Sequence, residues 1–292
     1  MARIFALLPS VMILCGLAAL AGGCERGAGP EDGGAALSVR GDRLFVQAVV
    51  NGHETEALLD SAAEISLLDS SFARSIGIAA EGADVVKGSG GEQEVAFASG
   101  VAIVAVGRRL DDLTVAVLDL SDISTRLIGE PITTVLGREI FDSGRLEVDI
   151  ARGVIRTVDD GRVPPGEALE LREQHGVEAF YVTVDGAQSV LAEFDLGNGS
   201  EVLIGAQLAE RLGLAEEHNI VERRTGGGIG GAREREIVII PSLIVAGVTF
   251  ENVEAAIDRT ENASDINLGV SVLRRFLMTV DFPQRRIWLE PY

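Results

Sequence analysis

Residues 49–63 read VVNGHETEALLDSAA, and residues 183–198 read TVDGAQSVLAEFDLGN. Each stretch contains an Asn-Gly or Asp-Gly pair, which is typical of a tight β-hairpin turn. Each then runs through a strand-like stretch and reaches an aspartate, Asp60 in the first and Asp195 in the second. A chain that carries this pattern twice can bring two carboxylates together across a pseudo-twofold axis. Two carboxylates held that close share one proton and form an acid–base pair.

Further matching features follow each aspartate in the same order. A Gly-rich stretch comes first in both halves, then an apolar-apolar-Gly element, and each half closes on a strand–turn–strand pattern. Asp195 lies 135 residues after Asp60, and Gly269 lies 132 residues after Gly137. Because the spacing is held over a whole half of the chain, the sequence indicates an internal duplication.

Alternation of apolar and polar residues dominates both halves, as at Leu44, Val46 and Ala48, and this period of two predicts strands. Helical patterns are short and few. Ser70 is expected to cap one helix that ends at Gly77, since glycine favours helix C-termini. The sequence therefore predicts a mainly antiparallel β protein with two similar lobes, a cleft between them and Gly-rich flaps.

Four segments are expected along the chain. The joint between the halves is placed at 159–166, where aspartates, glycines and a Pro-Pro pair interrupt any regular element. The four segments are a signal peptide at 1–23, a lipidated N-terminus and flexible tether at 24–36, an N-terminal lobe at 37–160 and a C-terminal lobe at 161–292.

The N-terminus has the order of a secretory signal. Arg3 is followed by apolar residues at 4–20, too few for a spanning helix, and then by small residues before Cys24. This arrangement resembles a bacterial lipoprotein box, in which the cysteine is lipidated, although Leu20 lies one place further from Cys24 than the usual pattern has it. Ordinary signal cleavage is the alternative. Lipidation is favoured because the only other cysteine, Cys15, would be removed with the signal.

Composition excludes several classes of partner. A formal net charge of −20 argues against nucleic acid and against a basic face on anionic lipid. Membrane association is therefore expected only through the lipid on Cys24, on an exported protein that faces the periplasm or the cell surface. No phosphate-binding loop or Gly-x-Ser-x-Gly pattern is present. Neither a cofactor nor a metal is expected, because the three histidines lack metal-ligand spacing: His53, His175 and His218.

The aspartate segments resemble the retropepsin-like branch of the aspartic proteases. Residues 58–63 stand in the place of the family's apolar-apolar-Asp-Thr/Ser-Gly-Ala motif, and residues 194–198 stand in its second copy. Residues 227–231 are similar to a retroviral flap tip, and the end of the chain resembles that of bacterial members. The resemblance runs from about Leu37 to the C-terminus. It implies a bilobal pepsin-like acid protease fold with both halves fused, so that a monomer is expected.

The resemblance also implies an active site. Asp60 and Asp195 are expected to be the catalytic pair that activates water for peptide-bond hydrolysis. The supporting loops are expected to hold Ser61, Ala62, Leu196, Gly197 and Asn198. The flap residues are expected to be Gly88, Gly90, Gly227, Gly228, Ile229 and Gly230.

Neither copy keeps the full family motif. Ser61 retains a hydroxyl that could bond across to the other loop, whereas Leu196 has none. Ala62 carries a methyl group where the family has glycine. Asn198 is expected to bond the outer oxygen of Asp195, and the apolar neighbours of Asp195 predict that it holds the shared proton.

Two functions follow from these residues. The first is an aspartic endopeptidase that acts on a peptide or protein substrate. The alternative is a catalytically inactive lipoprotein of the same fold that binds peptides in its cleft, because fold alone does not carry function.

Overall fold

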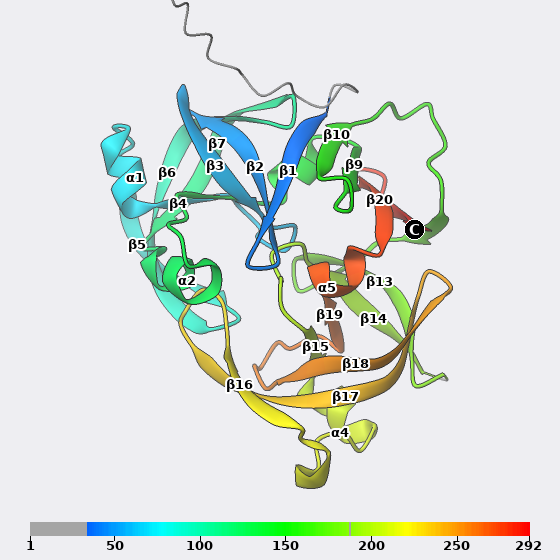
Figure 1. The fold of residues 1–292 in the computed structure, drawn as a ribbon. Helices are drawn as coiled ribbons and strands as arrows, with labels where there is room; N and C mark the ends of the chain where they lie inside the picture. The colour runs from blue at the N-terminus through cyan, green and yellow to red at the C-terminus, as the bar shows by residue number, and fades with distance from the viewer. Residues whose placement is uncertain (1–33, 187) are drawn as a thin grey trace, which may run out of the picture.

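The computed structural model describes residues 34–186 and 188–292. The predicted signal peptide, Cys24 and most of the predicted tether lie outside these residues. The described chain is mainly β and forms two sheet-rich lobes, which confirms the predicted fold class (Figure 1). None of the helices in these two ranges is long and apolar enough to cross a membrane.

The N-terminal lobe contains a sheet in the order β1-β2-β3-β8-β4-β7-β6-β5. Its strands are β1 (Ala35–Arg40), β2 (Arg43–Val50), β3 (His53–Leu59), β4 (Leu67–Asp69), β5 (Glu81–Gly88), β6 (Gly91–Ala105), β7 (Arg108–Leu118) and β8 (Thr134–Leu136). Its short helices are α1 (Ser70–Ser75), α2 (Ser121–Ile123), the π-helix η1 (Ser124–Ile128) and α3 (Glu139–Asp142).

The C-terminal lobe contains a second sheet, in the order β12-β13-β14-β19-β15-β18-β17-β16. Its strands are β12 (Arg172–Gln174), β13 (Val177–Val184), β14 (Gln188–Phe194), β15 (Val202–Gly205), β16 (Glu222–Gly226), β17 (Arg233–Val245), β18 (Val248–Asp258) and β19 (Ile266–Leu268). Its helices are α4 (Ala206–Arg211), the 3-10 helix η2 (Glu217–Asn219) and α5 (Val270–Leu273).

The pairing of the strands repeats between the lobes. In the first lobe β3 runs parallel to β8, and β8 pairs antiparallel with β4. In the second lobe β14 runs parallel to β19, and β19 pairs antiparallel with β15. The duplication inferred from sequence therefore extends to the strand order around each aspartate.

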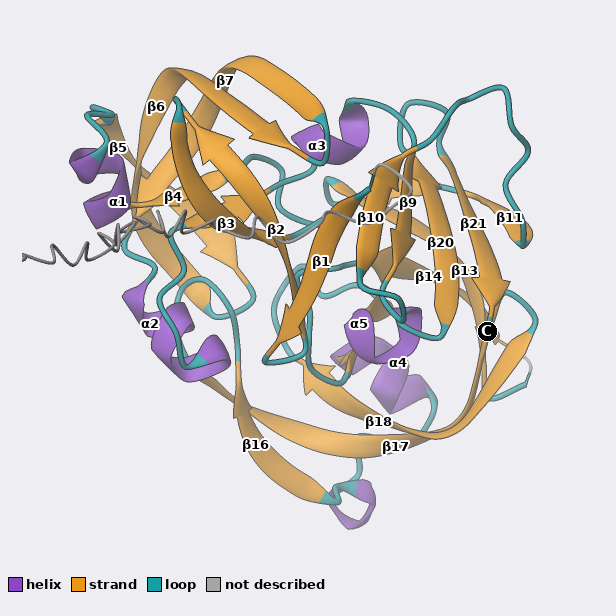
Figure 2. Ribbon diagram, turned by 45° about the horizontal axis from the view of Figure 1, so that its top comes forward, coloured by secondary structure: helices purple, strands orange, loops and turns teal. Residues whose placement is uncertain are grey.

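The remaining strands join β1 in a layer shared by both halves, in the order β11-β21-β20-β9-β10-β1 (Figure 2). They are β9 (Leu146–Asp149), β10 (Val154–Thr157), β11 (Glu167–Glu170), β20 (Phe276–Asp281) and β21 (Arg286–Pro291). The two predicted closing hairpins are β9–β10 and β20–β21, and they meet where β20 pairs with β9. The closing hairpins of the two halves thus join the lobes to each other.

Side chains behind the aspartates add to this connection. The ring of Phe282 lies 5.2 Å from that of Phe141 and 6.3 Å from that of Phe194, measured between centroids. Arg145 and Asp281 are both buried and form an ion pair at 3.0 Å. Because removal of one partner would leave a buried charge uncompensated, this pair holds the halves in one arrangement.

One predicted helix boundary is wrong. Asp69, and not Ser70, caps α1, because its Oδ1 accepts from the backbone N–H groups of Ser71 at 2.9 Å and Phe72 at 3.2 Å. The end of the helix is as predicted, with Gly77 just beyond it at φ +75°.

Candidate active site

Asp60 and Asp195 are held by the same backbone contacts. Each follows the last residue of its strand, and each N–H donates at 3.0 Å to the carbonyl of the parallel neighbour, Leu136 for Asp60 and Leu268 for Asp195. Oδ1 of each carboxyl then accepts two backbone N–H groups from its own loop. These come from Ala62 and Ala63 at 3.0 and 3.1 Å, and from Gly197 and Asn198 at 2.9 and 3.1 Å.

Ser61 connects the two aspartate loops. Its buried hydroxyl donates to the carbonyl of Phe194 and accepts from the N–H of Leu196, both at 2.9 Å. This is the bond across the lobes expected for Ser61. The side chain of Leu196 is buried in the main core and returns no such bond, so the connection is made from one side.

Gly197 lies directly against the opposite carboxyl group. A Cβ built on Gly197 would lie 2.3 Å from Cγ of Asp60 and within 2.6 Å of both its oxygens. The equivalent residue, Ala62, is partly exposed and lines the cleft. The close approach therefore demands glycine in the second loop, while the first loop accommodates alanine.

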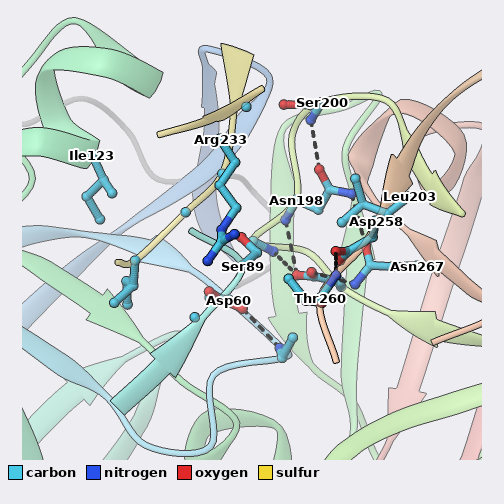
Figure 3. A pocket seen from close by; sticks show the side chains of 18 of the residues that line it. Asp60, Ser89, Ile123, Asn198, Ser200, Leu203, Arg233, Asp258, Thr260 and Asn267 are labelled. Carbon is cyan, nitrogen blue, oxygen red and sulfur yellow. Dashed lines mark hydrogen bonds between the residues drawn. The ribbon is translucent and has the colours of Figure 1, made fainter. Parts of the chain in front are cut away.

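Asn267 contacts Asp195, and the side chain of Asn198 does not. Nδ2 of Asn267 donates to Oδ2 of Asp195 at 2.9 Å and to Glu193 at 3.1 Å. The amide of Asn198 donates to Oδ1 of Asn267 at 2.9 Å, and its own Oδ1 accepts from Ser200 (Figure 3). The expectation that the Asn198 side chain bonds Asp195 is thus wrong, and Asn198 instead orients Asn267.

These contacts favour a position of the shared proton opposite to the one expected from the sequence. Burial and the negative charge of Asp195 raise the pKa of Asp60 to about 7. Burial also raises the pKa of Asp195, but three hydrogen bonds, led by that from Asn267, oppose the rise, and the charge of Arg43 lowers the pKa of both carboxyls. Because Asp60 accepts two hydrogen bonds and Asp195 three, these contacts favour the negative charge on Asp195 and the proton on Asp60.

Both carboxyls line a cleft of about 720 Å³ that is bounded by both flaps. The first flap is the β5–β6 hairpin, in which Gly88 ends β5 and Gly90 lies in the turn, and the second is the β16–β17 hairpin. The turn of the second holds the other predicted flap residues, Gly227, Gly228, Ile229 and Gly230. The structure thus brings the predicted aspartates, loops and flaps together around one space.

The two flap tips touch each other over the cleft. The N–H of Gly90 donates to the carbonyl of Ile229 at 2.9 Å, and Nε of Arg233 donates to the carbonyl of Gly90 at 2.7 Å. A Cβ on Gly90 would lie 2.1 Å from the carbonyl oxygen of Gly231. The glycines therefore permit backbone contact between the tips, which cover the cleft.

Arg126 fastens the second flap to the first lobe. Its guanidinium donates to three successive carbonyls, those of Gly226 at 3.2 Å, Gly227 at 2.6 Å and Gly228 at 3.1 Å. Asp122 orients it through an ion pair of 2.7 Å. Figure 1 shows the β16–β17 hairpin reaching across from the second lobe towards α2, next to the helix that carries Arg126.

Residues 46–140 and 180–272 match the sequence profile of the aspartyl proteases, in two repeats that together span more than half of the chain. The chain belongs to the aspartyl protease family. The two matched ranges each contain one of the paired aspartates, as the duplication predicts for this family. A comparison with curated proteins gave no significant match.

Several residues of this aspartyl protease site carry no local signal in the sequence. Asn267 and Arg43 act on the dyad from elements distant in the chain, and Arg126 and Arg233 act on the flaps. At the position that matches Asn267 in the first half the chain has the apolar residue Val135. A polar residue that replaces an apolar one at a matched position was the available signal.

Proposed function

We propose that this aspartyl protease family member is an active endopeptidase that hydrolyses peptide bonds with Asp60 and Asp195. The observation that carries the proposal is the pair of carboxyls in one covered cleft, where Asp60 accepts two hydrogen bonds and Asp195 three. Burial beside Asp195 also raises the pKa of Asp60 to about 7. A carboxyl that keeps its proton beside one that is ionised supplies a general acid and a general base at the same pH.

The reaction follows from that division of charge. Asp195 takes a proton from a water molecule held between the carboxyls, while Asp60 donates its hydrogen bond to the substrate carbonyl oxygen. The water oxygen bonds to the carbonyl carbon and forms a tetrahedral intermediate with no covalent link to the enzyme. Asp195 then passes its proton to the departing nitrogen, the C–N bond breaks and the dyad returns to one proton. The flaps support this chemistry because they exclude bulk water from the cleft.

We further propose an exported, lipid-anchored protein that faces the periplasm or the cell surface. The order of charged, apolar and small residues before Cys24 supports export, and the position of Cys24 supports lipidation. A monomer is proposed because one chain supplies both aspartates and both flaps. The net charge of −20 supports a peptide or protein substrate over nucleic acid.

The test is incubation of the protein with a mixed peptide library in H₂¹⁸O between pH 4 and pH 7. We expect new C-termini that carry ¹⁸O, seen by mass spectrometry, and their loss when a statine-type inhibitor is added. Peptides retained without cleavage would contradict the endopeptidase. That result would support the alternative function, a peptide-binding lipoprotein. Two residues favour this alternative, because Leu196 lacks a hydroxyl and Ala62 replaces a glycine.

Replacing Asn267 with leucine is expected to move the acid limb of the pH profile. The ionised form of Asp195 loses the donor at 2.9 Å, so the pKa of Asp195 rises. Activity that depends on ionised Asp195 then needs a higher pH, and the acid limb of kcat/KM shifts upward by about one unit. The matched control is Asn262→Leu, on the same wall of the cleft and exposed. An unchanged acid limb in Asn267→Leu would remove Asn267 from this role.

A further inference from the structure

The two lobes present different chemistry at equivalent positions of the cleft. In the N-terminal lobe Leu58, two residues before Asp60, lies opposite Val135 on the paired strands. In the C-terminal lobe the same places are taken by Glu193, two residues before Asp195, and Asn267. All four side chains belong to residues that line the cleft.

The difference continues around each half of the cleft. Ile132 lies three residues before Val135, and its counterpart Ser264 lies three residues before Asn267. In the N-terminal lobe these side chains belong to one apolar cluster, which also receives the flap residue Ile229: Phe45, Leu58, Leu67, Val95, Ala116, Leu118, Leu120, Ile132 and Val135. Leu118, opposite Asp69, is replaced in the other lobe by Asp258, opposite Gly205. One half of the cleft is therefore aliphatic and the other polar.

Glu193 is the charged centre of the polar half. It accepts hydrogen bonds from Ser264 Oγ and from Asn267 Nδ2, and burial raises its pKa. Among the described ion pairs, none involves Glu193. The negative charge of Asp195 adds to that rise. A partly buried carboxyl with acceptor sites left over is costly to cover with an apolar side chain.

The arginines of the same wall already have partners. Arg224 pairs with Glu201, Glu222 and Glu254. Arg259 pairs with Glu236, and Arg235 donates to the carbonyl of Ser89. These arginines therefore interact with groups other than Glu193, and Glu193 lines the cleft next to the two aspartates.

We propose that Glu193 makes the C-terminal half of the cleft a subsite for a substrate side chain that donates hydrogen bonds, an amide or an ammonium. The aliphatic half takes an apolar side chain on the other side of the scissile bond. This inference rests on the proposed endopeptidase function and assigns its substrate class. An apolar residue in the polar half leaves Glu193 unpaired, which costs roughly 10- to 100-fold in affinity.

The test separates binding from cleavage. The full chain is titrated calorimetrically with uncleavable hydroxyethylene peptides whose central pair is Leu/Leu, Leu/Gln, Gln/Leu, Leu/Lys or Lys/Leu. We expect at least one of the four peptides with a mixed central pair to bind about tenfold or more tightly than the Leu/Leu peptide. Glu193→Leu, which copies the residue at Leu58, should reverse that preference. Glu193→Gln should keep the preference for glutamine and lose that for lysine, and Glu251→Gln, on an exposed strand position, should change neither.

Each outcome decides a different statement. Equal binding of Leu/Leu and every mixed peptide would overturn the subsite, as would a preference for lysine that persists in Glu193→Gln if Glu193→Leu fails to fold. Absence of binding by all five peptides would overturn it as well. If the mixed peptides bind as expected and the matching natural peptides are not cut, the subsite stands and the endopeptidase is wrong.

Discussion

Replacing Asp195 with asparagine is expected to remove peptide hydrolysis and to stabilise the fold at neutral pH. Asparagine cannot accept a proton from water, so kcat should fall by roughly 10³-fold or more while KM changes little. The amide is nearly the same size as the carboxyl and leaves the loop contacts at Oδ1 in place, although its Nδ2 no longer accepts the hydrogen bond from Asn267. The measurement is steady-state cleavage of the best library peptide.

The pKa of Asp60 determines how the stability of the fold changes with pH. Its folded value of about 7 lies above the ordinary value of 3.8. The stability from its protonation is therefore fully present below about pH 4 and is lost as the pH rises to 7. Above pH 7 the parent holds two buried negative charges side by side. The Asp195→Asn variant holds one, so its Tm should exceed that of the parent by several degrees at pH 7.5 and by less at pH 4.

Asp185→Asn is the matched control for both measurements. Asp185 is exposed in the β13–β14 turn at φ +50°, a backbone conformation that asparagine also tolerates. Neither kcat nor Tm should change. Retained hydrolysis in Asp195→Asn would show that Asp195 is not the base, and a Tm that does not rise at pH 7.5 would show that the two carboxyls do not repel each other.

The duplicated fold could be predicted from the sequence because its signals are local. The residues next to each aspartate determine both the strand that precedes it and the N–H groups that bond its Oδ1, so matching segments give matching loops. The Gly-rich turns are local in the same way. Even so, the predicted helix cap was wrong, because the adjacent residues Asp69 and Ser70 are both good capping residues. Asp69 ends β4, and its position at the end of that strand places it at the cap.

The position of the proton could not be predicted in this way. It depends on Asn267, which lies 72 residues from Asp195 in sequence and contacts it only through the pairing of β14 with β19. Asn198 was the nearer candidate in sequence, yet its amide reaches Asn267 and not the carboxyl. Arg126 is a similar case, 101 residues from the flap carbonyl of Gly227. Contacts through space between polar side chains leave no periodic pattern to read.

Replacing Gly197 with alanine is expected to disrupt the dyad. The new Cβ would lie 2.3 Å from Cγ of Asp60, a separation that real Cβ atoms essentially never show. Asp60 must then move away from Asp195, or the loop after Asp195 must retreat and lose its bond to Ser61. We expect kcat/KM to fall by about 100-fold or more, because misplacement by about 1 Å has that effect. The free energy of unfolding should fall by about 1–3 kcal/mol, measured by urea denaturation.

The asymmetry between the lobes makes this prediction decisive. If the two aspartate loops were equivalent, alanine would be tolerated at Gly197, because the matching residue of the first lobe is Ala62. The structure predicts the opposite, since Ala62 borders the open cleft whereas Gly197 borders the carboxyl of Asp60. Gly161→Ala is the control, in an exposed loop where the nearest atom is the flexible end of Asp159 at 3.2 Å. If Gly197→Ala kept the activity and stability of that control, the close contact between Gly197 and Asp60 would not be what positions the pair.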